Sequence, residues 1–192
     1  MRLIAITAED YVEGEAKAIE RLLDNGFAFV HLRKPHGSDQ QMLALVRSIH
    51  SRYHSRLTLA SNLGVWGECA LGGVHLNAAN EHRVGEFGGV RVSKSSHCEA
   101  DLADLSRFDY SFLSPVFDSI SKPGYRAAFS HDQLRAILSN PVMRQKLVAL
   151  GGVTPARIPI LASLGFQSAA LLGYLNPNSN SDSDPNSDPN SD

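Results

Sequence analysis

The chain has 192 residues, of which 43% are hydrophobic and 20% charged, and its formal net charge is −2. This composition is typical of one globular domain, and the near-neutral charge argues against nucleic acid or a membrane surface as the main partner. The two cysteines lack metal-type spacing, and the first apolar run is too short for a signal peptide, so we expect a cytoplasmic protein.

Short apolar or β-branched runs recur along the chain, each bounded by Gly, Asn, Ser or charged residues. Several are apolar throughout, as strands of a parallel sheet are when both faces are buried. We therefore predict strands at residues 3–7, 28–32, 57–60, 73–76, 90–93, 110–113, 147–150 and 169–172.

Helical patterns alternate with these strands. Apolar stripes at residues 16–23 and 42–49 follow helical spacing, Ser130 and Gln133 form a capping box before a third stripe, and Thr154 precedes a proline suited to a first helical turn. This alternation predicts a compact (β/α)8 barrel (TIM barrel) over residues 1–175. The length requires short connections after the third and fourth strands and a reduced or missing eighth helix. A doubly wound open sheet is the structural alternative.

The last segment, residues 176–192, contains only Asn, Pro, Ser and Asp. Such a composition cannot bury enough apolar surface to fold, so we predict a disordered tail. The tail contains four aspartates, which leaves the predicted barrel slightly positive and mildly favours an anionic ligand.

In a (β/α)8 barrel the active site lies at the carboxyl ends of the strands, so the residues after each predicted strand are its candidates. Hydrogen-bond donors are frequent among them, and Asp118 is the one carboxylate that we expect at the barrel mouth. Glycines there let the backbone approach an anion closely. The candidate binding residues are Arg33, Lys34, Asn62, His75, Asn77, Ser95, Ser119, Ser121, Lys122, Gly151, Gly152 and Gly173.

Within this set, we predict that the hydroxyls and the lysine of residues 119–122 hold a phosphate together with Gly152 and Gly173. Structural interpretations stay open for several members. His75 can be a histidine of the core, and Gly151 and Gly152 can be needed for packing or a turn. The basic pair at residues 33–34 can simply be exposed on the surface.

Five segments occur in order at these strand ends: "HLRK", "GGVHLN", "SKSSH", "SPVFDSISK" and "ALGGVT". With them, the chain resembles the thiamine phosphate synthase/TenI family of (β/α)8 barrels over residues 1–175. The resemblance implies an enzyme of thiamine biosynthesis that binds a phosphorylated thiazole and, in the synthase branch, a pyrimidine pyrophosphate. It also allows a homo-oligomer.

The resemblance further implies roles for individual residues. Arg33, Ser119, Ser121 and Lys122 would face the pyrophosphate, Ser95 would lie near the reacting centre, and the regions of Gly152 and Gly173 would hold the thiazole phosphate. The chain departs from the synthase pattern at the magnesium ligands, where Ser61, Asn62 and Asn80 replace carboxylates, and at Pro35, where the pattern has lysine. We therefore expect no metal cofactor, with Mg²⁺ required only if the chain is a synthase.

The TenI branch of that family also lacks the acidic pair, and its members convert a thiazole phosphate carboxylate into its aromatic tautomer. That proton shift needs no metal and suits an imidazole, so His97 is the predicted catalytic residue, with Asp118 as the rival base. Two alternatives stay open: a thiamine phosphate synthase with a rearranged metal site, and a non-catalytic ligand-binding or regulatory barrel.

Overall fold

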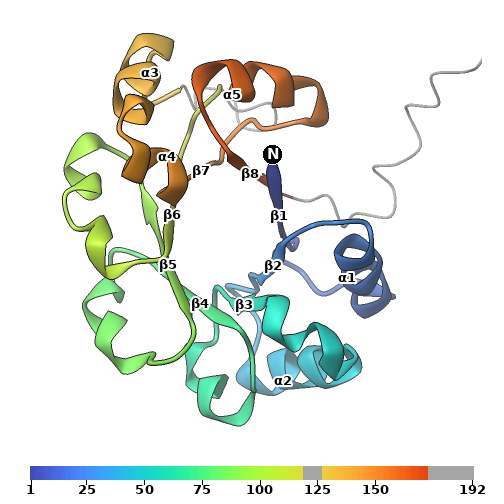
Figure 1. Cartoon of the computed structure of the whole chain (residues 1–192). Helices are drawn as coiled ribbons and strands as arrows, with labels where there is room; N and C mark the ends of the chain where they lie inside the picture. Colours follow the sequence, from blue (N-terminus) through green and yellow to red (C-terminus); the bar gives the residue numbers. More distant parts are fainter. Residues whose placement is uncertain (119–126, 173–192) are drawn as a thin grey trace, which may run out of the picture.

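In the computed structural model, residues 1–118 and 127–172 are described, and they contain a closed barrel of eight parallel strands in chain order (Figure 1). The ring closes where β1 pairs with β8, with Ile4 opposite Ala170. The predicted (β/α)8 barrel is therefore confirmed over this part of the chain, and the open sheet is excluded. The strands are β1 Arg2–Ile6, β2 Phe29–Leu32, β3 Leu57–Leu59, β4 Gly73–Leu76, β5 Arg91–Ser96, β6 Tyr110–Leu113, β7 Leu147–Ala149 and β8 Ser168–Leu172.

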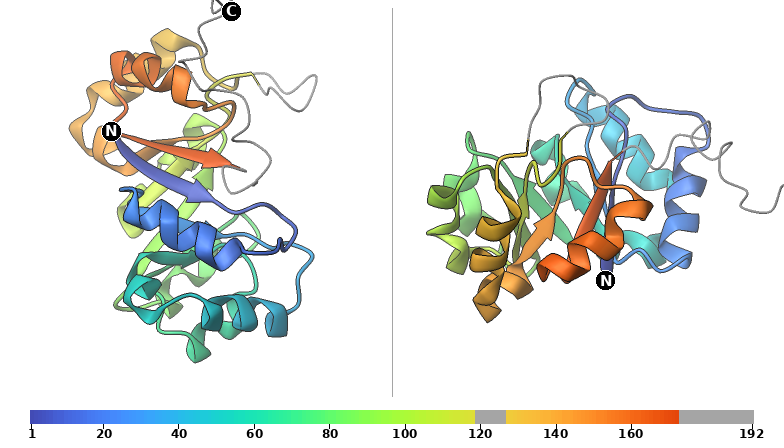
Figure 2. Two further views of the ribbon diagram at one scale, coloured as in Figure 1. Left: turned by 90° about the vertical axis from the view of Figure 1, so that its right-hand side faces the viewer. Right: turned by 90° about the horizontal axis from the view of Figure 1, so that it is seen from above.

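Helices surround the barrel on its outer face (Figure 2). The α-helices are α1 Glu15–Asp24, α2 Asp39–Ser48, α3 His131–Ser139, α4 Pro141–Lys146 and α5 Ile158–Leu164. The 3₁₀-helices are η1 Ser51–Arg56, η2 Leu63–Glu68, η3 Glu81–Glu86, η4 Glu99–Leu102, η5 Leu105–Arg107 and η6 Pro155–Arg157. The connections after β3 and β4 are short, as predicted, and the connection after β5 is also built from 3₁₀ turns. The segment after β8, where we predict a reduced or missing eighth helix and the tail, lies outside the described residues.

Local sequence sets several helix starts. Ser38 and Ser130 each accept a hydrogen bond from the backbone N–H three residues on, and the side-chain oxygens of Gln41 and Gln133 accept one from the backbone N–H of the cap residue. Thr154 begins only the 3₁₀ turn η6, and α5 starts at Ile158. Pro159 therefore lies in the first turn of α5, where its missing N–H costs no helical hydrogen bond.

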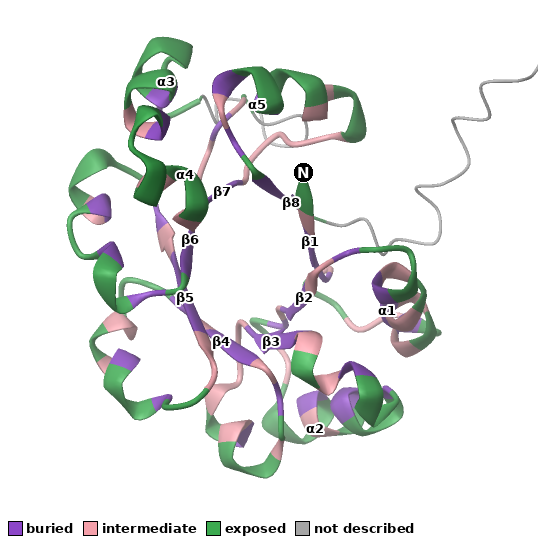
Figure 3. Cartoon of the chain, in the orientation of Figure 1, coloured by how far each residue is buried: buried purple, intermediate pink, exposed green. Residues whose placement is uncertain are grey.

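Because neighbouring residues of a strand point to opposite faces, alternate side chains fill the barrel interior and the layer beneath the helices. The interior holds an apolar cluster that includes Ile4, Phe112 and Val148. The intervening residues, such as Val30 and Leu32, belong to the cluster under α1 and α2. Figure 3 shows the strands as the most continuously buried part of the ribbon.

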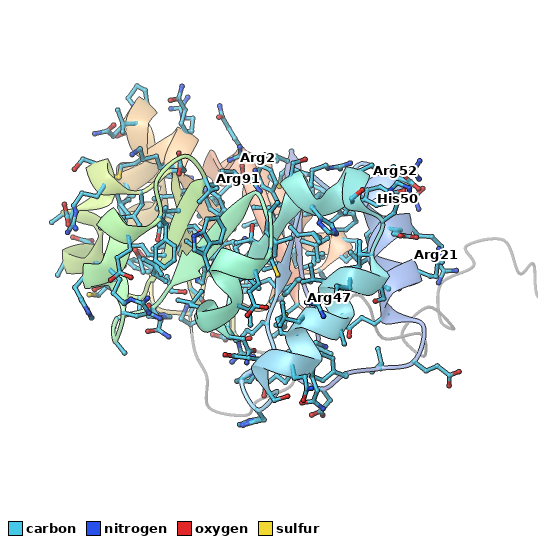
Figure 4. All side chains as sticks on the ribbon, turned by 90° about the horizontal axis from the view of Figure 1, so that it is seen from below. Arg2, Arg21, Arg47, His50, Arg52 and Arg91 are labelled. Carbon is cyan, nitrogen blue, oxygen red and sulfur yellow. The ribbon has the colours of Figure 1, made fainter. Side chains whose placement is uncertain are left out.

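Arg91, at the start of β5, lies at the amino-terminal end of the barrel. Its Nη1 donates a hydrogen bond to the carbonyl of Ser55 at 2.9 Å, and its guanidinium carbon lies 3.9 Å from the ring centre of Phe29. Figure 4 shows Arg91 and Arg2 at this same end. No helix in the described part of the chain is long and apolar enough to cross a membrane.

Candidate active site

A cavity of about 320 Å³ opens at the carboxyl end of the barrel. It is lined by five of the predicted site residues: Arg33, His75, Asn77, Ser95 and His97. Sequence reasoning missed the three other polar or charged residues that line it: His31, Glu81 and Asp101. The alternation of strand residues carries a signal for His31, which lies two residues before Arg33 and therefore on the same face.

His97 follows β5, and its ring has a defined tautomer. Its Nδ1 lies 2.9 Å from the carbonyl oxygen of Ser114, which can only accept a hydrogen bond, so Nδ1 carries the proton. In the neutral ring Nε2 then has a free lone pair. The backbone N–H of His97 donates to the Asp101 carboxylate at 2.6 Å, which fixes the start of the turn that carries the ring. These contacts equip His97 to accept a proton at Nε2.

His75 lies between two serines of β5. The Ser93 hydroxyl donates to the carbonyl of Val74 at 3.3 Å, so it accepts from Nδ1 of His75 at 2.9 Å. Nε2 of His75 then accepts from the Ser95 hydroxyl at 2.9 Å. Burial, with a smaller contribution from the Arg33 charge, lowers the pKa of His75 to about 3. His75 is therefore neutral at physiological pH and serves to orient Ser95.

A second buried imidazole, His31, forms part of the cavity floor. Its Nε2 lies 2.6 Å from the Tyr110 hydroxyl, and its ring packs against Phe112 with 4.7 Å between ring centres. Burial, followed by the charges of His75 and Arg91, holds the pKa of His31 well below its ordinary value. His31 thus adds an uncharged polar group to the floor.

Arg33 supplies positive charge at the cavity. Its Nη1 forms an ion pair with the Glu9 carboxylate at 2.6 Å, and its backbone N–H donates to the Thr7 hydroxyl at 2.9 Å. The arginine side chain keeps 39% of its surface exposed, so its other donors can reach a ligand.

The neighbouring Lys34 does not line the cavity, and this corrects the expectation that it belongs to the site. Because it is adjacent to Arg33, it points to the opposite face, beneath the loop between β1 and α1. Its side chain is fully buried, and its ammonium group donates to the carbonyls of Ala8 and Asp10 and to the Glu15 carboxylate. All three ammonium hydrogens are used there.

The two predicted asparagines differ in place. Asn62 lies outside the cavity lining, and its amide nitrogen donates to the carbonyl of Gly37 at 2.8 Å and to the Asp39 carboxylate at 3.0 Å. Asn77 lines the cavity, and its side-chain oxygen accepts from the backbone N–H of Ala79. Asn62 therefore joins two loops, which makes it a poor candidate for ligand contact.

Gly151 and Gly152 follow β7 with φ of 91° and 64°. A Cβ atom on Gly152 would lie 2.5 Å from the carbonyl oxygen of Asp118, so the loop after β6 begins directly against this glycine. The Asp118 carboxylate accepts from the backbone N–H of Ala127 and does not line the cavity. Ser119, Ser121, Lys122 and Gly173 lie outside the described residues. The phosphate-binding site that we predict from them and Gly152 therefore stays a prediction.

Comparisons with known proteins show which family the chain belongs to. The sequence profile of the thiamine monophosphate synthase family matches residues 3–175. The chain belongs to this family. As an established member, the thiamine-phosphate synthase of Escherichia coli strain K12 is 29% identical over 163 residues, which cover 80% of this chain and 77% of that protein.

Two further members are similar over most of their length. The thiamine-phosphate synthase of Caldivirga maquilingensis is 25% identical over 179 residues, which cover 88% of this chain and 86% of that protein. The crystal structure of thiamine phosphate pyrophosphorylase from Bacteroides thetaiotaomicron has a TM-score of 0.75 and 28% identity, and the match covers 90% of this chain and 83% of that one. The chain is thus a thiamine-biosynthesis barrel of the thiamine monophosphate synthase family.

The described residues hold no preformed metal site built from three or more His, Cys, Asp or Glu side chains. Glu81 and Asp101 line the cavity, which corrects the expectation that Asp118 is the one carboxylate there. Glu81 forms an ion pair with Lys94 at 2.9 Å, and hydrogen bonds from the backbone N–H groups of His97 and Cys98 help to hold the pKa of Asp101 below its ordinary value. Both carboxylates are engaged.

Proposed function

We propose that this member of the thiamine monophosphate synthase family is a metal-independent thiazole tautomerase. The observation that carries the proposal is the arrangement of His97, whose Nδ1–H is held by a carbonyl while Nε2 is free at the cavity. A histidine with a fixed tautomer can act as a general base and then as the acid that returns the proton.

In the proposed reaction, Nε2 of His97 removes a proton from one carbon of the non-aromatic thiazole ring. The protonated imidazole returns a proton to a second carbon, so that the ring becomes aromatic and the histidine is regenerated. The carbonyl of Ser114 stabilises the imidazolium formed between the two steps, because it accepts the Nδ1–H hydrogen bond throughout. No atom enters or leaves the substrate other than the transferred proton.

The Arg33 side of the cavity and the loop that follows Leu150, beyond the cavity lining, suit the two anionic groups of such a substrate. Arg33, on the β2 side, is the cation for the ring carboxylate, while the phosphate lies towards Gly152 on the β7 side. The Ser95 hydroxyl, oriented by His75, contacts the ring between them. This division leaves the reacting carbons next to His97.

Thiamine phosphate synthesis is the second candidate. It is favoured by the names of the relatives and by the two carboxylates, Glu81 and Asp101, that line the cavity. That reaction separates pyrophosphate from a pyrimidine, and Mg²⁺ would stabilise the departing charge. The two candidates therefore differ in their response to a metal chelator.

A turnover assay with each candidate substrate, with and without chelator, tests the proposal. We expect tautomerase turnover that the chelator leaves unchanged, and a fall of about 10²–10⁴-fold in kcat in the His97→Gln variant. The His82→Gln variant, which changes an exposed histidine outside the cavity lining, serves as the matched control. Turnover of His97→Gln within about threefold of the original, or synthase activity restored by Mg²⁺, would overturn the tautomerase proposal.

A further inference from the structure

An ion pair with no contact to the cavity lies beneath the loop between β1 and α1. The side chains of Lys34 and Glu15 keep 0% and 2% of their surface exposed, and Nζ lies 2.7 Å from Oε1. The desolvation cost of such a pair offsets most of its attraction, and well-packed apolar residues often stabilise a fold equally well. Stability alone therefore gives no reason to bury two charges here.

The partners of the lysine indicate what the pair holds. Nζ of Lys34 also donates to the carbonyl of Ala8 at 2.9 Å and to the carbonyl of Asp10 at 2.6 Å. These two residues flank Glu9, whose carboxylate pairs with Nη1 of Arg33. One ammonium group thus fixes the chain on both sides of the residue that contacts the cavity arginine.

The adjacent residues Arg33 and Lys34 act on opposite faces of the same strand end. Arg33 points into the cavity, and Lys34 points outward, under the loop that curves back over it. The Thr7 hydroxyl, at the start of that loop, also accepts from the backbone N–H of Arg33. Four successive residues, 7–10, therefore each form a hydrogen bond or ion pair with Arg33 or Lys34.

We propose that Lys34 is a positioning residue, which with Glu15 holds the loop at residues 8–10 so that Glu9 fixes the Arg33 guanidinium at the cavity. A pre-oriented guanidinium loses less rotational freedom when it binds an anion. The inference deepens the proposed function and rests on it for the identity of that anion, the carboxylate of the thiazole substrate. Loss of the pair should raise KM more than it lowers kcat, because Lys34 touches no reacting atom.

The test must separate positioning from folding. The single Lys34→Met variant leaves the Glu15 charge buried without a partner and can fail to fold. The double variant Lys34→Met/Glu15→Leu removes both charges at similar volume, so we expect its urea midpoint to change little. The Arg135→Met variant, which removes one partner of an exposed ion pair on α3, is the control.

Two readouts do not depend on turnover. In the double variant, amide exchange of residues 8–14 should accelerate at least tenfold, and modification of Arg33 by phenylglyoxal, followed by mass spectrometry, should be faster. In the assay, KM for the thiazole substrate should rise about tenfold with kcat within about threefold. Adding Glu9→Gln to the double variant should change KM no further, because both changes act through the same contact.

Unchanged loop exchange and unchanged Arg33 reactivity in a folded double variant would overturn the positioning role. An equal fall in kcat with KM unaltered would overturn it as well. If the unmodified protein turns over no thiazole substrate while the exchange and modification rates change as expected, the proposed function fails and the positioning role stands.

Discussion

Replacement of Gly152 by alanine tests how closely the loop after β6 packs against the end of β7. With φ of 64°, Gly152 has a left-handed backbone, which costs an L-residue roughly 1–2 kcal/mol. An added Cβ would also lie 2.5 Å from the carbonyl oxygen of Asp118 and 2.9 Å from Cβ of Phe117. Overpacking of this kind costs about 1–3 kcal/mol, so the free energy of unfolding should fall by about 2–5 kcal/mol.

Gly26 provides the matched control. Its φ is 91°, and an added Cβ would meet no atom within 4 Å, so Gly26→Ala carries the backbone cost alone. Urea unfolding of both variants, followed by circular dichroism, gives the steric contribution as the difference, expected at about 1–3 kcal/mol. A Gly152→Ala variant that loses no more stability than Gly26→Ala would refute the close approach of the two loops.

Two further predictions concern acid stability and the tail. His75 has a pKa of about 3 when folded and 6.5 ordinarily, so between these values the unfolded chain binds a proton that the folded chain does not. The contribution of His75 to the free energy of unfolding should therefore be complete above about pH 6.5 and fall by roughly 1.4 kcal/mol for each pH unit below it. In the His75→Gln variant, the free energy of unfolding from urea titrations at several pH values should depend less steeply on pH. Because residues 176–192 contain only Asn, Pro, Ser and Asp, their removal should leave Tm unchanged, and a lowered Tm would contradict the predicted tail.

The sequence by itself determined the architecture. Strands buried on both faces appear in the sequence as short apolar runs. Each of the eight predicted runs overlaps a strand of the barrel. The strand ends differ from the predicted ones by at most one residue, except that β5 extends to Ser96 because Ser95 and Ser96 still pair with β6. Once a parallel barrel is predicted, residues after each strand must gather at one end, so the places of His75, Ser95 and His97 at the cavity followed from order along the chain.

Only the tertiary structure decided which of those residues face the ligand space. Lys34 and Arg33 look equivalent as a basic pair, but strand alternation sends one into the cavity and the other into a buried ion pair with Glu15. Glu81 and Asp101 reach the cavity from short 3₁₀ turns, whose direction no periodicity encodes. The tautomer of His97 likewise depends on the carbonyl of Ser114, 17 residues away, because a hydrogen-bond partner supplied by another strand exists only after the barrel has closed.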